Sequence, residues 1–218
     1  VFAGEGVDDL LSRGNGNVNI DDRLGVLEQT YQSERIGKWR GFGRASLLQE
    51  GNDDYAIEVE SKVEYFARGD LSAALRVIML WSRDWLIWME DDLLASFHRT
   101  QATLAGDLNW FPAPNQELRL KLQWLGIDAH DATPFRIAPS GDLVESADLV
   151  SDFQVNNFGL QIRYRWTFAP QSDLYVVYGR GGLEFEDDPV DRGMSHLFSS
   201  AFDLRDSDQL IVKVRYRF

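Results

Sequence analysis

The chain has 218 residues, no cysteine and a formal net charge of −13, from 35 acidic and 22 basic residues. The lack of cysteine excludes disulfide scaffolds and cysteine-ligated zinc sites, and the acidic excess argues against general nucleic-acid binding because it repels phosphate backbones. The longest apolar stretches, 77–81 and 85–89, fall short of the roughly 20 residues of a membrane-spanning helix. We therefore expect no α-helical membrane segment in this sequence.

The first half of the chain alternates between apolar and polar residues, which predicts β-strands. In the segment 55–65, apolar side chains fall on one face and charged side chains on the other. The segments 38–48 and 71–81 follow the same pattern, and 23–31 follows it less regularly. Residues 1–22, which precede these strands, are expected to form an extracellular loop or a further strand.

The second half of the chain has the clearest alternation. Between residues 157 and 168, the period of two has no interruption. The same period predicts strands at 102–110, 117–124, 174–180 and 209–218. The chain thus has about nine predicted strands of roughly 9–12 residues, which is longer than the roughly 5–6 residues usual in soluble proteins.

The connections between the predicted strands differ in length. Because successive strands run in opposite directions, every second connection lies at the same end of the sheet. Most connections at one end are short. At the other end, the connections 83–93, 128–152 and 184–207 are long and contain many of the acidic residues. Tight periplasmic turns and longer extracellular loops are typical of outer-membrane β-barrels. Aromatic residues near both strand ends fit the two membrane interfaces.

We therefore predict an all-β fold, an antiparallel transmembrane β-barrel over residues 1–218, located in the Gram-negative outer membrane. A soluble β-sandwich or secreted barrel is the alternative, since it also alternates. Nine strands is an odd number, whereas single-chain bacterial barrels have an even number. We expect the chain to form the C-terminal portion of a larger even-stranded barrel; a strand hidden within 1–20 would also restore an even number.

In a barrel whose apolar face meets lipid, the polar face lines the lumen. The predicted lumen-lining residues are Glu58, Glu60, Lys62, Glu64, Arg119, Lys121, Arg163, Arg165, Lys213 and Arg215. The arginine and lysine residues of this set would either guide anionic solutes through a pore or pair with acidic residues and hold a filled barrel closed. The sequence leaves both possibilities open.

The last predicted strand has apolar residues at every second position back from the terminal residue. This pattern resembles the outer-membrane assembly signal, so we expect the barrel-assembly machinery to bind it. The residues concerned are Leu210, Val212, Val214, Tyr216 and Phe218.

Few residues are candidates for chemistry. His98, His130 and His196 are far apart in sequence, and His130 either joins neighbouring acids in a cation site or is a solvated loop residue. We expect no enzyme; a membrane-embedded hydrolase using Ser96 and His98 is the alternative, because these residues would share a strand face.

The acidic outer loops offer oxygen ligands that suit Ca²⁺ or Mg²⁺. These loops would share divalent cations with lipopolysaccharide phosphates, or their acids would serve solubility alone. We expect no other cofactor. The candidate metal ligands are Asp187, Asp188 and Asp191.

Four segments carry a family resemblance: 108–114, 117–127, 172–178 and 208–218. They resemble the C-terminal region of a large family of Gram-negative outer-membrane proteins of unknown function, and the resemblance covers about residues 80–218. It implies a barrel fold and an outer-membrane location. Longer family members carry an N-terminal β-sandwich resembling a family 9 carbohydrate-binding module; these 218 residues contain no such segment, so sugar binding is not implied.

Two functions follow from this interpretation. The first is a pore or transport channel for small solutes. The second is a surface-anchoring or ligand-binding barrel that carries a recognition domain and has no transport role. The expected partners are outer-membrane lipid, lipopolysaccharide and the barrel-assembly machinery, and no nucleic acid.

Overall fold

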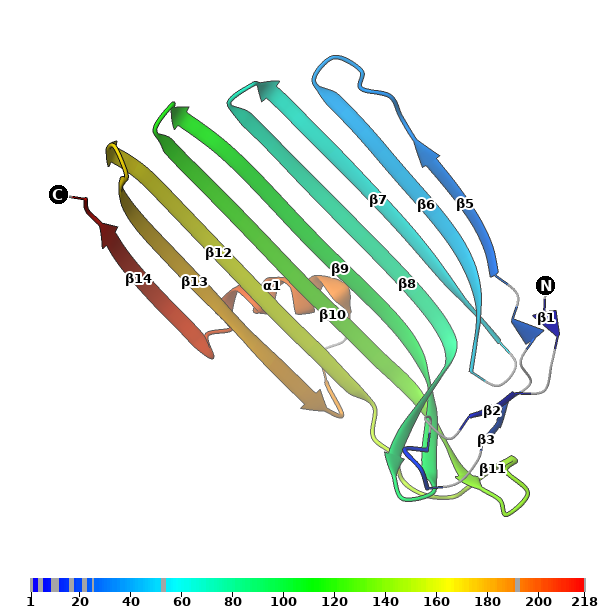
Figure 1. The fold of residues 1–218 in the computed structure, drawn as a ribbon. Coiled ribbons are helices and arrows are strands. Elements are labelled where there is room, and N and C mark those ends of the chain that lie inside the picture. The colour runs from blue at the N-terminus through cyan, green and yellow to red at the C-terminus, as the bar shows by residue number, and fades with distance from the viewer. Residues whose placement is uncertain are drawn as a thin grey trace.

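The structure is a computed structural model that describes residues 2–3, 6–8, 12–15, 18–20, 23–24, 26–51, 54–190 and 193–217. Its main feature is an antiparallel sheet of ten strands, in which neighbours in the sheet are also neighbours along the chain, apart from one short strand (Figure 1). This confirms the predicted all-β, antiparallel fold. Every predicted strand corresponds to a strand of this sheet.

The strands of the sheet follow in chain order as β5 (Val26–Gln32), β6 (Trp39–Glu50), β7 (Asp54–Arg68), β8 (Leu71–Glu90), β9 (Leu93–Ala113), β10 (Gln116–Ile137), β12 (Phe153–Ala169), β13 (Ser172–Asp187) and β14 (Ser207–Arg215), with β11 (Leu143–Glu145) paired to β10. Two small pairs precede them: β1 (Phe2–Ala3) with β4 (Arg23–Leu24), and β2 (Gly6–Asp8) with β3 (Val18–Ile20).

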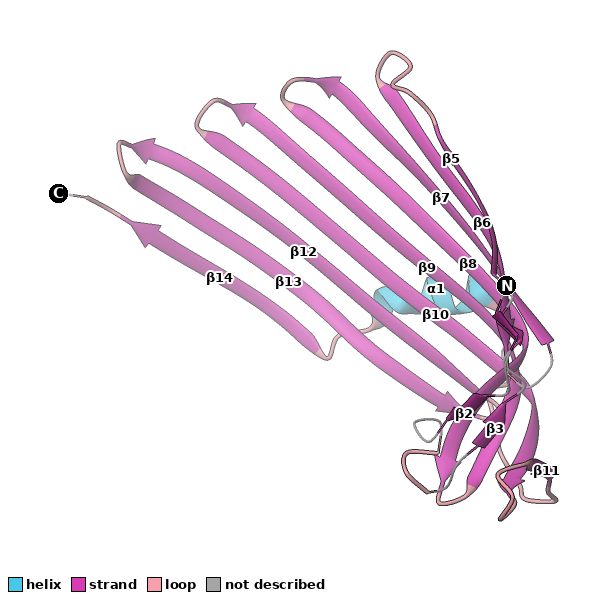
Figure 2. Cartoon of the chain, turned by 45° about the vertical axis from the view of Figure 1, so that its right-hand side comes forward, coloured by secondary structure: helices cyan, strands magenta, loops and turns pink. Residues whose placement is uncertain are grey.

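Two short helical segments connect β13 to β14. They are α1 (Met194–Ser200) and the 3-10 helix η1 (Ala201–Asp203). Both views place α1 across one face of the sheet, against β9 and β10 (Figures 1 and 2). None of the described helices has the length and apolar character needed to cross a lipid bilayer.

The strands extend further than the sequence pattern predicted. The connection 83–93 was expected to be a loop, but β8 and β9 continue through it and meet at a turn formed by Asp91 and Asp92. The connection 128–152 likewise begins with the last residues of β10. Bulges between Ser82 and Trp85, and between His130 and Thr133, explain the difference. A bulge shifts the alternation of side chains while backbone pairing continues beyond it.

The sheet is open in the described part of the chain. β5 and β14 each pair with a single strand and form its two edges. Closure into a barrel, which the sequence predicted, would require both edges to pair, because a barrel has no free edge. The antiparallel sheet is therefore established, and the closed barrel stays a prediction.

Candidate functional site

One face of the sheet, which we call the apolar face, carries hydrophobic side chains over the parts of the strands near the short turns. It includes residues 102–110 of β9, 118–124 of β10 and 158–168 of β12, counting every second residue. Many of these side chains are exposed, for example Leu75 at 51% and Val63 at 47%. Exposed apolar area of this extent indicates a surface that meets lipid or another protein.

Aromatic rings gather on this face at the short-turn ends. Trp39 lies 4.5 Å from Tyr65 between ring centroids, and Phe168 lies 5.7 Å from Trp166 and 6.3 Å from Tyr216. Trp39 and Tyr65 belong to the neighbouring strands β6 and β7, Trp166 and Phe168 both belong to β12, and Tyr216 follows β14.

Beyond residues 102, 124 and 158, the apolar face has a polar stretch, and further along the same side Leu86 and Leu94 form a separate apolar cluster with Val18. The same side of β10 continues with Asp128 and His130, the same side of β9 with Thr100 and His98, and Gln154 of β12 is paired opposite Asp128. The opposite side of these strands changes from polar to apolar at the same level. There it carries a packed hydrophobic cluster made of Ala95, Phe97, Ala129 and Phe153. The two faces thus exchange polarity at one level across three adjacent strands.

The other face, which we call the polar face, is concave at this end of the sheet. Arg99 of β9 reaches Glu50 of β6 at 2.5 Å, although two strands lie between them. Trp85 of β8 and Phe153 of β12, which are also separated by two strands, have ring centroids 6.0 Å apart. Side chains of strands so far apart in the sheet meet only on its inner side.

All ten predicted lumen-lining residues lie on the polar face. On the N-terminal strands they belong to an ion-pair network: Glu60 lies 3.0 Å from Arg44 and 2.6 Å from Arg76, and Glu58 lies 2.6 Å from Arg44. Glu64 pairs with Arg40 of β6 and with Lys62 at 2.9 Å. The acids and bases of these strands therefore neutralise one another locally.

The C-terminal strands continue this network on the polar face. Asp173, with 1% of its side chain exposed, lies 3.0 Å from Arg165 and 3.1 Å from Arg215. Arg119 pairs with Glu117, and Lys121 lies 4.0 Å from Asp107.

Two predicted lumen-lining residues stand apart from these pairs. Arg163 and Lys213 form no ion pair with any residue that the structure describes. Most of the predicted cationic ladder is therefore paired, and these two residues carry its remaining free positive charge.

The polar face has a hollow near its C-terminal strands. It is lined by residues of β10, β12, β13 and β14, including Gln123, Gln161, Gln209 and Lys121. Gly159 and Gly179 lie in its wall, where an added Cβ atom would meet nothing within 4 Å. The polar face therefore has open space beside glutamine side chains and the charged side chain of Lys121.

The predicted assembly-signal residues Leu210, Val212, Val214 and Tyr216 share the apolar face at the edge of the sheet and are exposed. Phe218 lies outside the described residues, as does Asp191 among the candidate metal ligands. Within the described part of the chain, Asp187 and Asp188 belong to no group of three converging ligand side chains.

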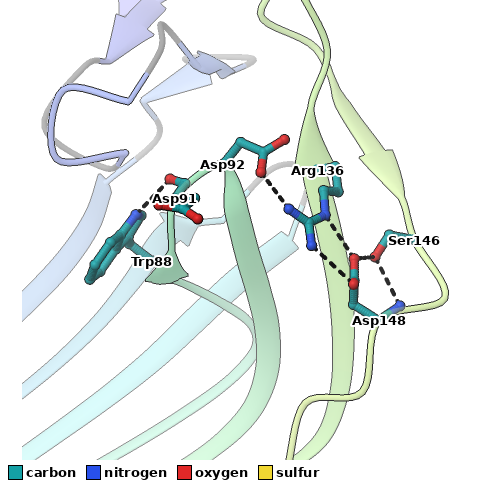
Figure 3. Close-up of polar contacts among 6 residues, drawn as sticks. All are labelled: Trp88, Asp91, Asp92, Arg136, Ser146 and Asp148. Atoms are coloured by element: carbon teal, nitrogen blue, oxygen red, sulfur yellow. Dashed lines mark hydrogen bonds and ion pairs between the residues drawn. The ribbon is translucent and has the colours of Figure 1, made fainter.

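The long connection after β10 is fixed to the sheet by Arg136 (Figure 3). Its guanidinium lies 2.5 Å from Asp92 in the β8–β9 turn and donates hydrogen bonds of 2.8 and 3.0 Å to Asp148. The Ser146 hydroxyl donates to the same carboxylate at 2.7 Å. These bonds from Arg136 and Ser146 lower the pKa of Asp148 to about 2.

We expect this attachment to weaken only in strong acid. A lowered carboxyl pKa means that the stabilising contribution is complete above the ordinary value of 3.8 and is lost as the pH falls through about 2. Hydrogen-exchange protection of residues 138–152, corrected for intrinsic rates, should stay constant down to about pH 4 and then fall. Asp148→Asn should lower that protection at neutral pH, whereas Glu145→Gln in the same connection should not; equal effects of the two variants would contradict this account.

Ser96 and His98 lie two residues apart on β9 and share a face, as the hydrolase alternative required, but they contact different carboxylates. Ser96 donates a hydrogen bond to Asp84, whereas Nδ1 of His98 lies 3.1 Å from Asp131. His98 is also paired directly opposite His130, which sequence reasoning missed. The register between β9 and β10 brings these histidines together, and the sequence spacing gave no signal of it.

A family profile described as "Domain of unknown function (DUF5916)" matches residues 93–218. The matched region starts at the first residue of β9 and covers most of the segment in which the sequence resembled an uncharacterised family. No curated protein and no solved structure matches the chain.

Proposed function

The chain belongs to the DUF5916 family, whose description names no activity, and we propose that it forms part of a Gram-negative outer-membrane β-barrel that passes small polar solutes. In this proposal the apolar face meets lipid and the polar face lines the lumen. The short turns lie on the periplasmic side, and the extended ends of β8, β9 and β10 stand outside the cell.

The exchange of polarity between the two faces carries this proposal. The apolar segments 102–110, 118–124 and 158–168 span nine, seven and eleven residues, and a tilted strand needs about 9–11 to cross the hydrocarbon core. The helical segments α1 and η1 cover the far ends of these segments at Ala102, Trp124 and Phe158. A soluble sandwich buries one face along the whole length of its strands. In a membrane barrel, by contrast, the outer face becomes polar where the strands leave the lipid.

The curvature and the edges of the sheet support the same arrangement. The ion pair between Arg99 and Glu50 indicates that the polar face is the inner one. Unpaired backbone groups at a sheet edge are too costly in lipid, so a membrane sheet has to close. We infer that further strands pair with β5 and β14 to complete the barrel.

The polar face suits polar solutes with little net charge. Most of its charged groups are paired, and the hollow beside Gly159 and Gly179 is lined by glutamine side chains together with Lys121. Arg163 and Lys213 retain free positive charge among the described residues, which predicts a mild preference for anions.

The native protein should therefore carry ion current in planar lipid bilayers, with a reversal potential that indicates mild anion selectivity. The double substitution Arg163→Glu with Lys213→Glu should shift the reversal potential toward cations, because it replaces free positive charges with negative ones. Ser195→Glu, on the exposed side of α1, should leave it unchanged. If the double substitution left the reversal potential of the current unchanged, the placement of the polar face in the lumen would be contradicted.

A second function is favoured by the apolar cluster on the concave side. Trp85 and Phe153 meet across two strands there, at the outer end of the polar face. Such a cluster would cover the outer mouth of a lumen and suit a surface-anchoring or binding barrel without transport. Absence of any current from the native protein would overturn the pore and leave this second function.

A further inference from the structure

Two histidines stand side by side on the outer ends of the long central strands. His98 of β9 is paired directly with His130 of β10, and their rings meet edge to face with centroids 5.7 Å apart. Both lie on the polar continuation of the apolar face. The exposed fractions of their side chains, 45% for His98 and 33% for His130, leave them accessible from solvent.

A bulge brings a carboxylate to the same place. In a regular strand, Asp131 would point away from the face that carries His130, because successive side chains alternate. Asp131 instead has a left-handed backbone with φ of +57°, at the bulge between His130 and Thr133. Its Oδ2 atom consequently lies 3.1 Å from Nδ1 of His98 and 3.9 Å from Nε2 of His130.

We propose that His98, His130 and Asp131 bind a divalent first-row transition-metal ion of the Zn²⁺ type. One ligand atom from each of the three side chains lies within 4.8 Å of the other two. Two imidazoles and a carboxylate form a recognised zinc donor set, in which a fourth position remains for water or another ligand. Imidazole ligands favour such ions over Ca²⁺ and Mg²⁺, which prefer oxygen.

Asp128 lies beside the His130 ring and supports this site. Nδ1 of His130 is buried, has no hydrogen-bond partner among the residues that the structure describes, and lies 3.8 Å from Oδ2 of Asp128. The Asp128 side chain is only 10% exposed, and its other oxygen accepts a hydrogen bond of 2.9 Å from Gln154. A carboxylate behind the non-ligating nitrogen of a histidine is the usual arrangement around metal-bound imidazole, because it fixes the orientation of the ring.

The proposal is independent of the pore function and can be tested on the full chain in detergent. Titration with Co²⁺ should give visible absorption bands of a low-coordinate nitrogen and oxygen site, and calorimetry with Zn²⁺ should give one site per chain. The chain has no cysteine, so thiolate binding cannot produce either signal. His98→Ala and Asp131→Asn should each abolish the bands, whereas His196→Ala, which removes an exposed histidine on α1, should retain them.

A second variant tests the role of Asp128 without removing a ligand. Asp128→Asn should keep the Co²⁺ bands and weaken the affinity for Zn²⁺ about 10- to 100-fold. Zn²⁺ should also raise the melting temperature of the wild type and not that of His98→Ala, with the β-sheet circular dichroism of both unchanged before metal is added. The site would be refuted by absence of Co²⁺ bands in the wild type, or by Zn²⁺ affinity that survives His98→Ala and falls with His196→Ala.

Discussion

The substitution Ile162→Arg should lower the free energy of unfolding of the protein in lipid vesicles by about 2–4 kcal/mol. Ile162 lies midway along the apolar segment of β12, between Leu120 of β10 and Tyr178 of β13. In the proposed barrel, an arginine there would place a charge near the centre of the hydrocarbon core, where no water or acidic partner would compensate it. Denaturant unfolding followed by tryptophan fluorescence measures the change.

The adjacent substitution Gln161→Arg is the matched control. Gln161 is exposed on the polar face, beside the hollow lined by glutamine side chains. The same new side chain should therefore cost less than about 1 kcal/mol at this position, since an exposed charge interacts weakly with its neighbours. Equal costs at 161 and 162 would contradict the assignment of the two faces.

Site-specific labelling distinguishes an apolar face that meets lipid from one that another protein covers. The chain lacks cysteine, so single cysteines can be introduced along 162–168, beyond the part of β12 that α1 covers, without a background signal. Probes at even positions should be quenched by brominated lipid and probes at odd positions by a water-soluble quencher. Quenching from water at both sets of positions would exclude the membrane proposal.

Trp124→Ala should have the second large effect, about 3–5 kcal/mol of stability, because it removes a large buried side chain. Trp124 is 5% exposed and packs against Phe198 of α1 with ring centroids 5.0 Å apart. Its indole donates a hydrogen bond of 2.9 Å to Asn156, which in turn donates to the carbonyl of Leu197 and the hydroxyl of Ser200. The substitution should therefore release α1 from the sheet.

Hydrogen exchange of residues 194–203 together with denaturant unfolding tests this expectation. Trp124→Phe should keep most of the packing and lose only the hydrogen bond, at about 1 kcal/mol. Trp166→Ala, which removes a ring that is 39% exposed on the same face, should leave the protection of α1 unchanged. If the amides of α1 keep their protection in Trp124→Ala, Trp124 is not what holds the helix.

The alternation of residues was sufficient to predict the sheet. The period of two in 157–168 placed β12 correctly, and the same period placed the predicted lumen-lining residues on one face. Side-chain direction in a strand depends only on local backbone geometry, so it can be read from the order of residues. The prediction failed where bulges interrupt the period, and the outer ends of β8, β9 and β10 were consequently taken for loops.

The sequence by itself therefore determined the antiparallel strands, their two faces and the family resemblance of the C-terminal region. Only the tertiary structure decided which charges pair across strands, how the faces exchange polarity near Trp124, and that His98 meets His130 and Asp131. These features depend on the register between strands and on the curvature of the sheet. Register and curvature arise from contacts between residues distant in sequence, which a local pattern does not contain.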